Sequence, residues 1–374
     1  MVATRPMRDR TVPAQTWIAL LGRQDRPTDG LADYCASLGR ALEDVGVELE
    51  QVRVRWIEKG WARALWQLWR ESIDWRGHWV LVQYTGLSWS RRGFPLGAFA
   101  VLAILRHRGA RCAVVFHEFS RQAASSRWID QIRGDCQEWV IRRLYQKAAK
   151  GVFTVPLEAA SWLPKDEGKA VFIPIGGNVP ECLVRRPAPA TSNQKRAVVV
   201  FGVTGAPATG GELEDIVGVV RETSKALGKL RLIVIGRGST EVKDQITRAL
   251  EGSDVEVAIR GLLPAEEVTR EFTSADALLF VRGAITLQRG SAIAGIACGL
   301  PIVGYQNGRI SGPLEEAGIE WSPWGDRDGM IRGLVRVLSD PHRWMELHER
   351  NLQAQKKYFS WSRIAEQYLG ALAE

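Results

Sequence analysis

The 374-residue sequence has no long apolar run, because its longest apolar stretches fall far short of the roughly 18 residues that span a bilayer. We therefore expect no transmembrane helix. The first ten residues, MVATRPMRDR, carry charge with no apolar segment behind them, which predicts that there is no signal peptide. The five cysteines are scattered and include no C-x-x-C pair, which argues against a zinc site or a disulfide framework and predicts a cytoplasmic protein.

The sequence also lacks the short motifs that would identify a cofactor or a nucleic acid. The loop GRQDRPTDG (22–30) follows the first apolar strand, but its glycines lie only at its ends and do not form a compact G-x-G-x-x-G. NAD or FAD is therefore not expected. Paired Cys/His fingers and RNP-type aromatic strands are missing as well, so nucleic acid is not an expected partner.

Positive charge is present in excess and is unevenly distributed. The net charge is +8, and residues 1–180 hold 26 Lys and Arg against 18 Asp and Glu, so the whole surplus lies in the first half. Eleven of the fifteen tryptophans precede residue 163. A basic half of this kind is suited to an anionic lipid surface or a phosphorylated substrate.

Short apolar strands alternate with Gly-bearing loops and amphipathic helices along the whole chain. TWIALL (16–21), WVLVQY (79–84) and CAVVF (112–116) are examples from the first half, and AVVVFG (197–202) opens the same scheme again. This alternation predicts parallel sheets covered by helices on both faces, and two such series predict two doubly wound α/β domains. We place the domains at 1–184 and 197–357, with a proline-rich linker at 185–196 and a last helical segment at 358–374, where Ser360 is positioned as a cap.

Ligands of open α/β sheets bind beyond the carboxyl ends of the strands, and in a two-domain chain they bind in the cleft between the domains. His117 and Glu118 directly follow an apolar strand, where a histidine could orient or deprotonate a hydroxyl; the alternative is a surface turn. Asp29 and Gly30 open the first helix and could approach a ligand, although Asp29 could equally serve only as the helix cap.

The stretch RGSAIAGIACGLPIVG (289–304) predicts an anion site in the second half. Gly290 and Ser291 open a short helix whose free amides favour an anion, and Arg282 and Arg289 flank it with positive charge. Arg237, in the loop GRGS after another strand, offers a further cation, with a solvated loop as the alternative. Small residues let this helix and a ligand lie close to the sheet. The alternative is that the small residues only allow tight packing of the helix and have no role in binding.

These pieces, in this order, resemble the glycosyltransferases of family 4. The resemblance covers nearly the whole chain and is carried by DGLADY (29–34), VQYTGLSWSRRGFPLG (82–97), VVFHEF (114–119), IPIGGN (173–178), IRGLLPAEEV (259–268) and ACGLPIVG (297–304). It implies the GT-B architecture, two Rossmann-like domains that face a central cleft. It further implies a nucleotide-sugar donor, transfer that retains the anomeric configuration, and no metal or other cofactor.

The chain departs from this family at the acids of the donor site. The family has a Glu, seven residues and a second Glu before the A-C-G-L-P segment, and Thr286 and Ala294 occupy these positions here. The basic pair of the loop after the first strand of the second domain is also missing from VFGVTGAPATGG (200–211). Either the donor pocket is rewired around other residues, or it no longer catalyses.

Two segments are candidates for contact with the inner face of a membrane, residues 56–75 and 91–108, because tryptophans, an apolar stretch and arginines occur together there. The alternative is that both are helices covering the sheet. The resemblance places Tyr84, Arg91 and Arg92 on the acceptor side.

The sequence thus predicts a peripheral cytoplasmic glycosyltransferase that moves a hexose-type sugar from a nucleotide to a saccharide acceptor, including a lipid-linked one, in surface or exopolysaccharide synthesis. His117, Glu118 and Thr286 are the predicted catalytic-site residues. The predicted donor-binding residues are Asp29, Gly30, Arg237, Arg282, Arg289, Gly290 and Ser291. Two alternatives stay open: a non-catalytic partner or scaffold protein, and a nucleotide-sugar epimerase on the same architecture.

Overall fold

The computed structural model describes residues 15–25, 29–118, 128–164, 168–182, 185–188, 195–204, 211–310 and 312–373. The chain divides into two compact units, one made of Met1–Ile173 with Ile364–Glu374 and the other of Pro174–Arg363. The division at Ile173 lies upstream of the linker expected at 185–196, of which residues 189–194 are outside the described part.

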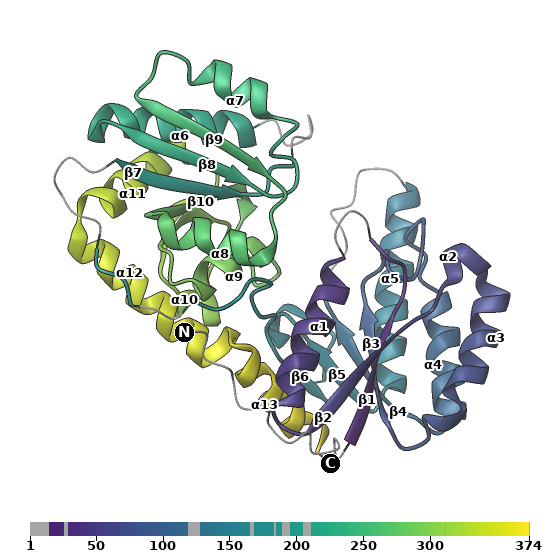
Figure 1. The fold of residues 1–374 in the computed structure, drawn as a ribbon. Helices are drawn as coiled ribbons and strands as arrows, with labels where there is room; N and C mark the ends of the chain where they lie inside the picture. Colours follow the sequence, from purple (N-terminus) through teal and green to yellow (C-terminus); the bar gives the residue numbers. More distant parts are fainter. Residues whose placement is uncertain are drawn as a thin grey trace, which may run out of the picture. The chain divides into compact units, whose positions relative to one another are not determined.

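The first unit is built on a parallel sheet with the strand order β2-β1-β3-β4-β5-β6 (Figure 1). Its strands are β1 (Gln15–Leu21), β2 (Val47–Arg53), β3 (Trp79–Tyr84), β4 (Arg111–Phe116), β5 (Lys150–Phe153) and β6 (Ala170–Phe172). Every residue of β3 is buried, because this strand is central and is covered on both faces. β2 alternates in polarity because it forms an edge.

Helices cover both faces of the first sheet. One face packs on side chains of α3, α4 and α5, and the other packs on α1 and the end of α13. The helices are α1 (Gly30–Glu43), α2 (Trp56–Lys59), α3 (Trp61–Glu71), α4 (Gly97–His107) and α5 (Trp128–Lys147), with short turns η1 (Ser72–Asp74) and η2 (Leu157–Ala159). The 91–108 segment contains α4, whose Val101, Leu102 and Leu105 are core residues, so burial explains most of its apolar character.

The second unit repeats the plan with the order β12-β11-β10-β7-β8-β9, and its paired strands are all parallel. Its strands are β7 (Arg196–Phe201), β8 (Leu230–Ile235), β9 (Val255–Gly261), β10 (Ala277–Ala284), β11 (Ile302–Gln306) and β12 (Ile319–Pro323). Its helices are α6 (Glu212–Leu227), α7 (Lys243–Ala249), α8 (Ala265–Ser274), α9 (Gly290–Ala297), α10 (Pro313–Glu316), α11 (Arg327–Ser339) and α12 (Pro341–Ala354). The sequence-based prediction of two doubly wound α/β sheets is confirmed.

The chain ends in a π-helical turn, η4 (Gln355–Phe359), followed by α13 (Trp361–Leu372). Ser360 accepts a hydrogen bond at its Oγ from the backbone N–H of Arg363 (3.3 Å), which confirms its role as a cap. Beyond Arg363 the helix packs in the first unit, where the hydroxyls of Tyr368 and Tyr34 share a hydrogen bond of 2.8 Å.

Candidate functional site

The carboxyl edge of the second sheet brings three loops side by side, because β10, β7 and β8 are neighbours. The loop after β7 is held against the loop after β8, since the N–H of Val203 donates to the carbonyl of Arg237 (2.8 Å). A Cβ at Gly238 would lie 1.7 Å from the carbonyl oxygen of Val203, so only glycine allows this approach. The Arg237 side chain is exposed at this edge.

Arg282 lies near the end of β10 and is the most constrained cation of this edge. Its Nη2 donates to the Oγ of Ser291 (2.8 Å), and its Nη1 would lie 3.0 Å from a Cβ at Gly202. Burial lowers the pKa of Arg282, and the neighbouring positive charge of Arg289 lowers it further, while Glu212 opposes the shift. A desolvated guanidinium stays protonated, so it can strengthen the binding of an anion.

Helix α9 starts beside this guanidinium. It begins at Gly290, and no side chain caps it, because Arg289 at the cap position accepts no bond at its side chain. The N–H groups of Gly290, Ala292 and Ile293 already donate to the carbonyls of residues 288 and 289, so the attraction for a negatively charged group at this end comes from the helix dipole and the neighbouring arginines. The structure thus brings Arg282, Arg289, Gly290 and Ser291 together, and it places Arg237 on the same edge, two strands away.

Trp324 belongs to this edge and was not predicted from the sequence. It follows β12 directly and is 57% exposed, and its ring packs edge-on against Tyr305 at 5.3 Å between centroids. A Cβ at Gly283 would lie 3.9 Å from the Trp324 ring and 3.4 Å from Nη2 of Arg289. A tryptophan left exposed right after a buried strand is the signal that could have identified it.

The two positions to which the sequence resemblance assigns an acid pair, 286 and 294, differ in their surroundings. Thr286 is exposed in the loop after β10, whereas Ala294 is fully buried in α9. A Cβ at Gly177 would lie 3.7 Å from the Cα of Ala294 and 3.0 Å from the Cβ of Ala297, so the 173–178 segment covers this part of the helix. A carboxylate at position 294 would have no room.

His117 and its partners form a second polar cluster, in the first unit. Its Nε2 lies 2.8 Å from Oε1 of Gln83, whose amide nitrogen donates to the carbonyl of Leu81. Because Oε1 of Gln83 can only accept, this arrangement makes Nε2 the protonated nitrogen of the neutral ring. Burial lowers the pKa of His117 to about 4, so its imidazole is neutral at physiological pH.

Glu118 lies next to His117 and is partly buried. Burial raises the pKa of its carboxyl, while a hydrogen bond from the N–H of Gly86 limits the increase. Tyr34 places its ring edge-on to His117 at 5.0 Å, which connects this cluster to Tyr368 of α13 through the shared hydroxyl hydrogen bond. A neutral base and an adjacent carboxyl are suited to binding a substrate hydroxyl.

The other predicted residues of the first unit are placed as follows. Asp29 caps α1 by accepting from the N–H of Ala32 (3.2 Å) and forms an ion pair with Arg53 (2.8 Å), so the capping alternative is confirmed. Tyr84 is 1% exposed and packs on Phe116 in the core, so it presents no group at the surface. Nothing lies within 4 Å of a Cβ at Gly30, and Arg91 and Arg92 are exposed.

Parts of three predicted stretches lie outside the described residues, namely Phe119, residues 26–28 and residues 205–210. Within the described part of the chain, no group of three or more His, Cys, Asp or Glu side chains could hold a metal ion. The helices of that part include none that is long and apolar enough to cross a membrane.

No family model and no curated protein matches the chain. Solved structures do match. Sucrose-phosphate synthase from Thermosynechococcus elongatus aligns with a TM-score of 0.65 at 16% identity, over 96% of this chain and 98% of that one. Anabaena Alr3699/HepE, in complex with UDP and glucose, gives 0.63 at 10% identity over 96% and 100%. The lipopolysaccharide outer core galactosyltransferase WaaB, in its apo form, gives 0.61 at 13% identity over 96% and 99%.

The chain spans only 58% of the length of TarM, another solved structure that it resembles, with a TM-score of 0.57 at 15% identity over 84% of this chain. At such identities the similarity concerns the fold. The chain has the GT-B fold, with two Rossmann-like units of parallel sheet and flanking helices.

Proposed function

We propose that this protein is a glycosyltransferase that moves a sugar from a nucleoside-diphosphate sugar to a saccharide acceptor. The observation that carries the proposal is the cluster of positive charge at the start of α9, where the half-buried Arg282 donates to Ser291 beside the exposed Arg289. Transfer requires a negative charge to develop on a departing diphosphate, and preorganised cations and helix amides stabilise that charge without a metal. The similarity to structures that bind UDP supports this assignment of the site.

The order of side chains along the second sheet suits such a donor. Exposed Leu262 follows β9, and Arg237 follows the neighbouring β8. Arg282 lies near the end of β10 and Arg289 follows that strand, while Trp324 follows β12 at the edge of the sheet. With strands roughly 4.8 Å apart, the β9-to-β10 separation is about 14 Å and the β10-to-β12 separation about 10 Å. An extended nucleotide sugar would place its base near Leu262, its diphosphate among the arginines and its sugar toward Trp324 and Thr286.

On the acceptor side, we assign His117 and Glu118 to the substrate hydroxyl. Gln83 holds Nε2 of the neutral imidazole and so orients the ring, and the Glu118 carboxyl, whose pKa burial raises, lies beside it and can bind the hydroxyl. Arg91 and Arg92 are the exposed cations that would contact an anionic acceptor. Retention of configuration and a role in surface or exopolysaccharide synthesis belong to this proposal.

A lipid-linked acceptor would bring the enzyme to the inner face of an anionic membrane. Trp66 and Ile73 are each 61% exposed, on α3 and η1, and Arg70 lies over the Trp66 ring at 4.8 Å. Exposed tryptophans beside arginines are typical of proteins that insert into the headgroup region. We propose this surface, rather than α4, as the membrane contact.

A second candidate function is that of a non-catalytic partner protein. Its supporting observation is that the family's acid positions hold Thr286 and the fully buried Ala294. It predicts nucleotide binding without turnover, or no binding.

Thermal unfolding with UDP, GDP, ADP, CDP and dTDP in separate samples tests the donor site. A diphosphate at about one hundred times its Kd stabilises the protein by about 2.7 kcal/mol, which shifts the midpoint by several degrees. We expect a shift with one base that is lost in Arg289→Ala and retained in Arg248→Ala, an exposed arginine of α7. No shift with any of the five diphosphates would overturn the proposal.

A further inference from the structure

Glu212, the first residue of α6, is an acid buried at the edge where β7 ends. It is 6% exposed, and its Oε2 accepts hydrogen bonds from the N–H of Thr204 (3.0 Å) and from the Thr204 hydroxyl. Its Oε1 is buried and has no hydrogen-bond partner among the residues that the structure describes. A buried carboxylate oxygen without a donor is costly, so it calls for an explanation.

Arg282, on the other side of the same loop, has a buried donor that lacks an acceptor within the described part of the chain. This donor is its Nε, while its Nη2 donates to Ser291 and its Nη1 lies against Gly202, two residues before Thr204. Glu212 and Arg282 attract each other electrostatically, but no ion pair forms between them. An unsatisfied acceptor and an unsatisfied donor are therefore carried by two side chains that are near enough to interact electrostatically.

A hydroxyl group meets both needs. It donates its one O–H to Oε1 of Glu212 and accepts the N–H of Arg282 with an oxygen lone pair. At the position between Oε1 and Nε, a phosphate or a carboxylate oxygen would accept from Arg282 but would be repelled by Glu212, so the diphosphate is assigned to the side of the guanidinium that faces Arg289. The pair therefore selects a neutral hydroxyl beside the anion site, where a nucleoside-diphosphate sugar carries several.

We propose that Glu212 is the hydroxyl-binding carboxylate of the donor site, with Oε1 accepting from a sugar hydroxyl of the donor and Nε of Arg282 donating to the same oxygen. The inference rests on the proposed function and extends it, because it supplies an acid that Thr286 and Ala294 do not. The hydroxyl has two sources with the same chemistry, the ribose of the nucleotide and the transferred sugar.

The test uses Glu212→Gln, which keeps the shape of the side chain. Thr204 donates to one end of the group, so the amide oxygen must stay there, and the amide NH2 then faces the N–H of Arg282 and the incoming hydroxyl. Thr204→Val is the matched control, because it removes the hydroxyl bond to Oε2 and leaves Oε1 unchanged. The ligand-free unfolding midpoint of each variant checks folding.

Titration calorimetry with UDP, 2′-deoxy-UDP and UDP-glucose, or their counterparts for the base that binds, separates the two sources. If the ribose is bound, wild type prefers UDP to 2′-deoxy-UDP by about 100-fold, and Glu212→Gln loses most of that preference while Thr204→Val keeps it. If the transferred sugar is bound, Glu212→Gln weakens UDP-glucose by about 10- to 100-fold and leaves UDP unchanged.

Unchanged affinities for all three ligands in a folded Glu212→Gln variant would overturn the inference and leave Glu212 a structural support of the Thr204 loop. A wild-type protein that binds no nucleoside diphosphate gives a different result, since it contradicts the proposed function and this inference with it.

Discussion

At the scale of single residues, Arg282 is explained better by a ligand than by the stability of the fold. Its guanidinium is desolvated, and among the described residues its hydrogen bond to a side chain is to Ser291. Taking a charge out of water costs free energy, and the attraction of Glu212 offsets this cost only in part, because no ion pair forms between the two side chains. A bound anion would offset the remaining desolvation cost of Arg282.

Arg282→Met separates these two effects. We expect the affinity for the bound nucleoside diphosphate to fall about 10- to 100-fold, because a hydrogen bond from a charged group contributes about 1.5–3 kcal/mol. The unfolding midpoint of the ligand-free protein should change little, because the substitution removes the desolvation cost of Arg282 together with its attraction to Glu212. Calorimetric titration and thermal unfolding measure the two quantities, and a lower midpoint with unchanged affinity would make Arg282 a structural residue.

His117 should make stability depend on pH. Its pKa is about 4 in the folded protein against an ordinary value of 6.5, so between these values the unfolded chain binds more protons. The free energy of unfolding should therefore decrease by at most about 1.4 kcal/mol per pH unit as the pH falls from 6.5 to 4. Urea unfolding of wild type and His117→Asn across this range checks it, and parallel curves would contradict the assigned pKa.

Side chains whose hydrogen-bond partners are near in sequence could be predicted, and side chains whose partners are distant in sequence could not. The cap made by Asp29 and the cap made by Ser360 depend on the next three residues, so the pattern contains them. Glu212 looks like an ordinary acid of a first helical turn. Its burial depends on Thr204 and Arg282, which come from other parts of the chain.

At the scale of elements, α9 shows why small residues fill the 289–304 stretch. All seven residues from Ser291 to Ala297 are buried, and a Cβ at Gly295 would lie 2.7 Å from Cδ2 of Leu278 in β10. The helix can pack this close to the sheet only with small side chains.

Introducing the acids that the sequence resemblance leads one to expect should have very different effects on stability at the two positions. Ala294→Glu places a charge in a fully buried position against the 173–178 segment and should lower the free energy of unfolding by about 3 kcal/mol or more. Thr286→Glu, at an exposed position, should change it by less than about 0.5 kcal/mol. Urea unfolding measures both, and a stable Ala294→Glu protein would show that the position is open.

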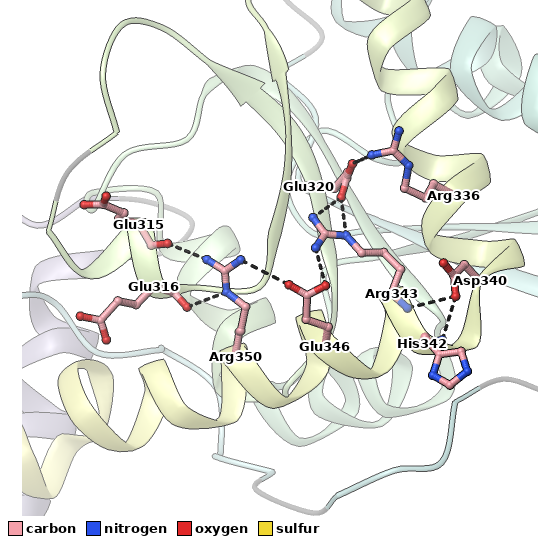
Figure 2. A network of polar contacts seen from close by, with 9 residues as sticks. All are labelled: Glu315, Glu316, Glu320, Arg336, Asp340, His342, Arg343, Glu346 and Arg350. Atoms are coloured by element: carbon pink, nitrogen blue, oxygen red, sulfur yellow. Dashed lines mark hydrogen bonds and ion pairs between the residues drawn. The ribbon is translucent and has the colours of Figure 1, made fainter.

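A charged network joins β12, α11 and α12 in the second unit (Figure 2). The carboxylate of Glu320 is nearly buried and accepts from Arg336 at Oε1 (2.9 Å) and from Arg343 at Oε2 (2.6 and 2.9 Å). Glu346, on the outer side of Arg343, is exposed. The bonds of Glu320 to the two arginines should therefore stabilise the fold more than the bond between Arg343 and Glu346.

Glu320→Gln should lower the free energy of unfolding by about 2 kcal/mol, because it leaves two arginines without their charged partner. Glu346→Gln, the matched control at the exposed end, should cost less than about 1 kcal/mol. Chemical denaturation of both variants provides the comparison, and equal losses would contradict the role given to burial.

The strands could be placed from the sequence because each is a short apolar run between glycine-bearing loops. β3 spans the predicted residues 79–84, and β4 differs from the prediction by one residue. The apolar run AVFIPI (170–175) forms a strand only over Ala170–Phe172. The N–H of Ile173 still donates to the carbonyl of Phe153 (2.9 Å), but the strand pairing with β5 ends at Phe172.

At the scale of the whole molecule, the division into units could be predicted only in part. The strand–helix rhythm indicates two doubly wound units, but it does not show that residues after Arg363 pack with the first one. That packing depends on contacts distant in sequence, such as the Tyr34–Tyr368 hydrogen bond and the bond from Nε1 of Trp79 to the carbonyl of Leu372 (2.8 Å). Such contacts are set by three-dimensional packing and leave no local pattern.

The charge asymmetry of the chain predicts membrane contact through the first unit. The wild-type protein should bind vesicles that contain anionic lipid, bind neutral vesicles little, and bind less as the salt concentration rises. Trp66→Ala should reduce the binding to anionic vesicles. Trp324→Ala is matched for exposure, at 57% against 61%, and should bind vesicles like wild type. Sedimentation with vesicles measures this, and equal losses in both variants would contradict a specific surface on α3.

Proton NMR tests directly whether the protein transfers a sugar. The protein is incubated with a mixture of nucleotide sugars and with an extract of lipid-linked and free saccharides, and the spectrum is followed over time. We predict that one nucleotide sugar is consumed, that its nucleoside diphosphate is released together with a new glycoside, and that Arg282→Met abolishes the reaction. If a nucleoside diphosphate binds but no nucleotide sugar is consumed, the protein is a nucleotide-binding protein without transferase activity. The assignment of the α9 site to sugar transfer is then wrong.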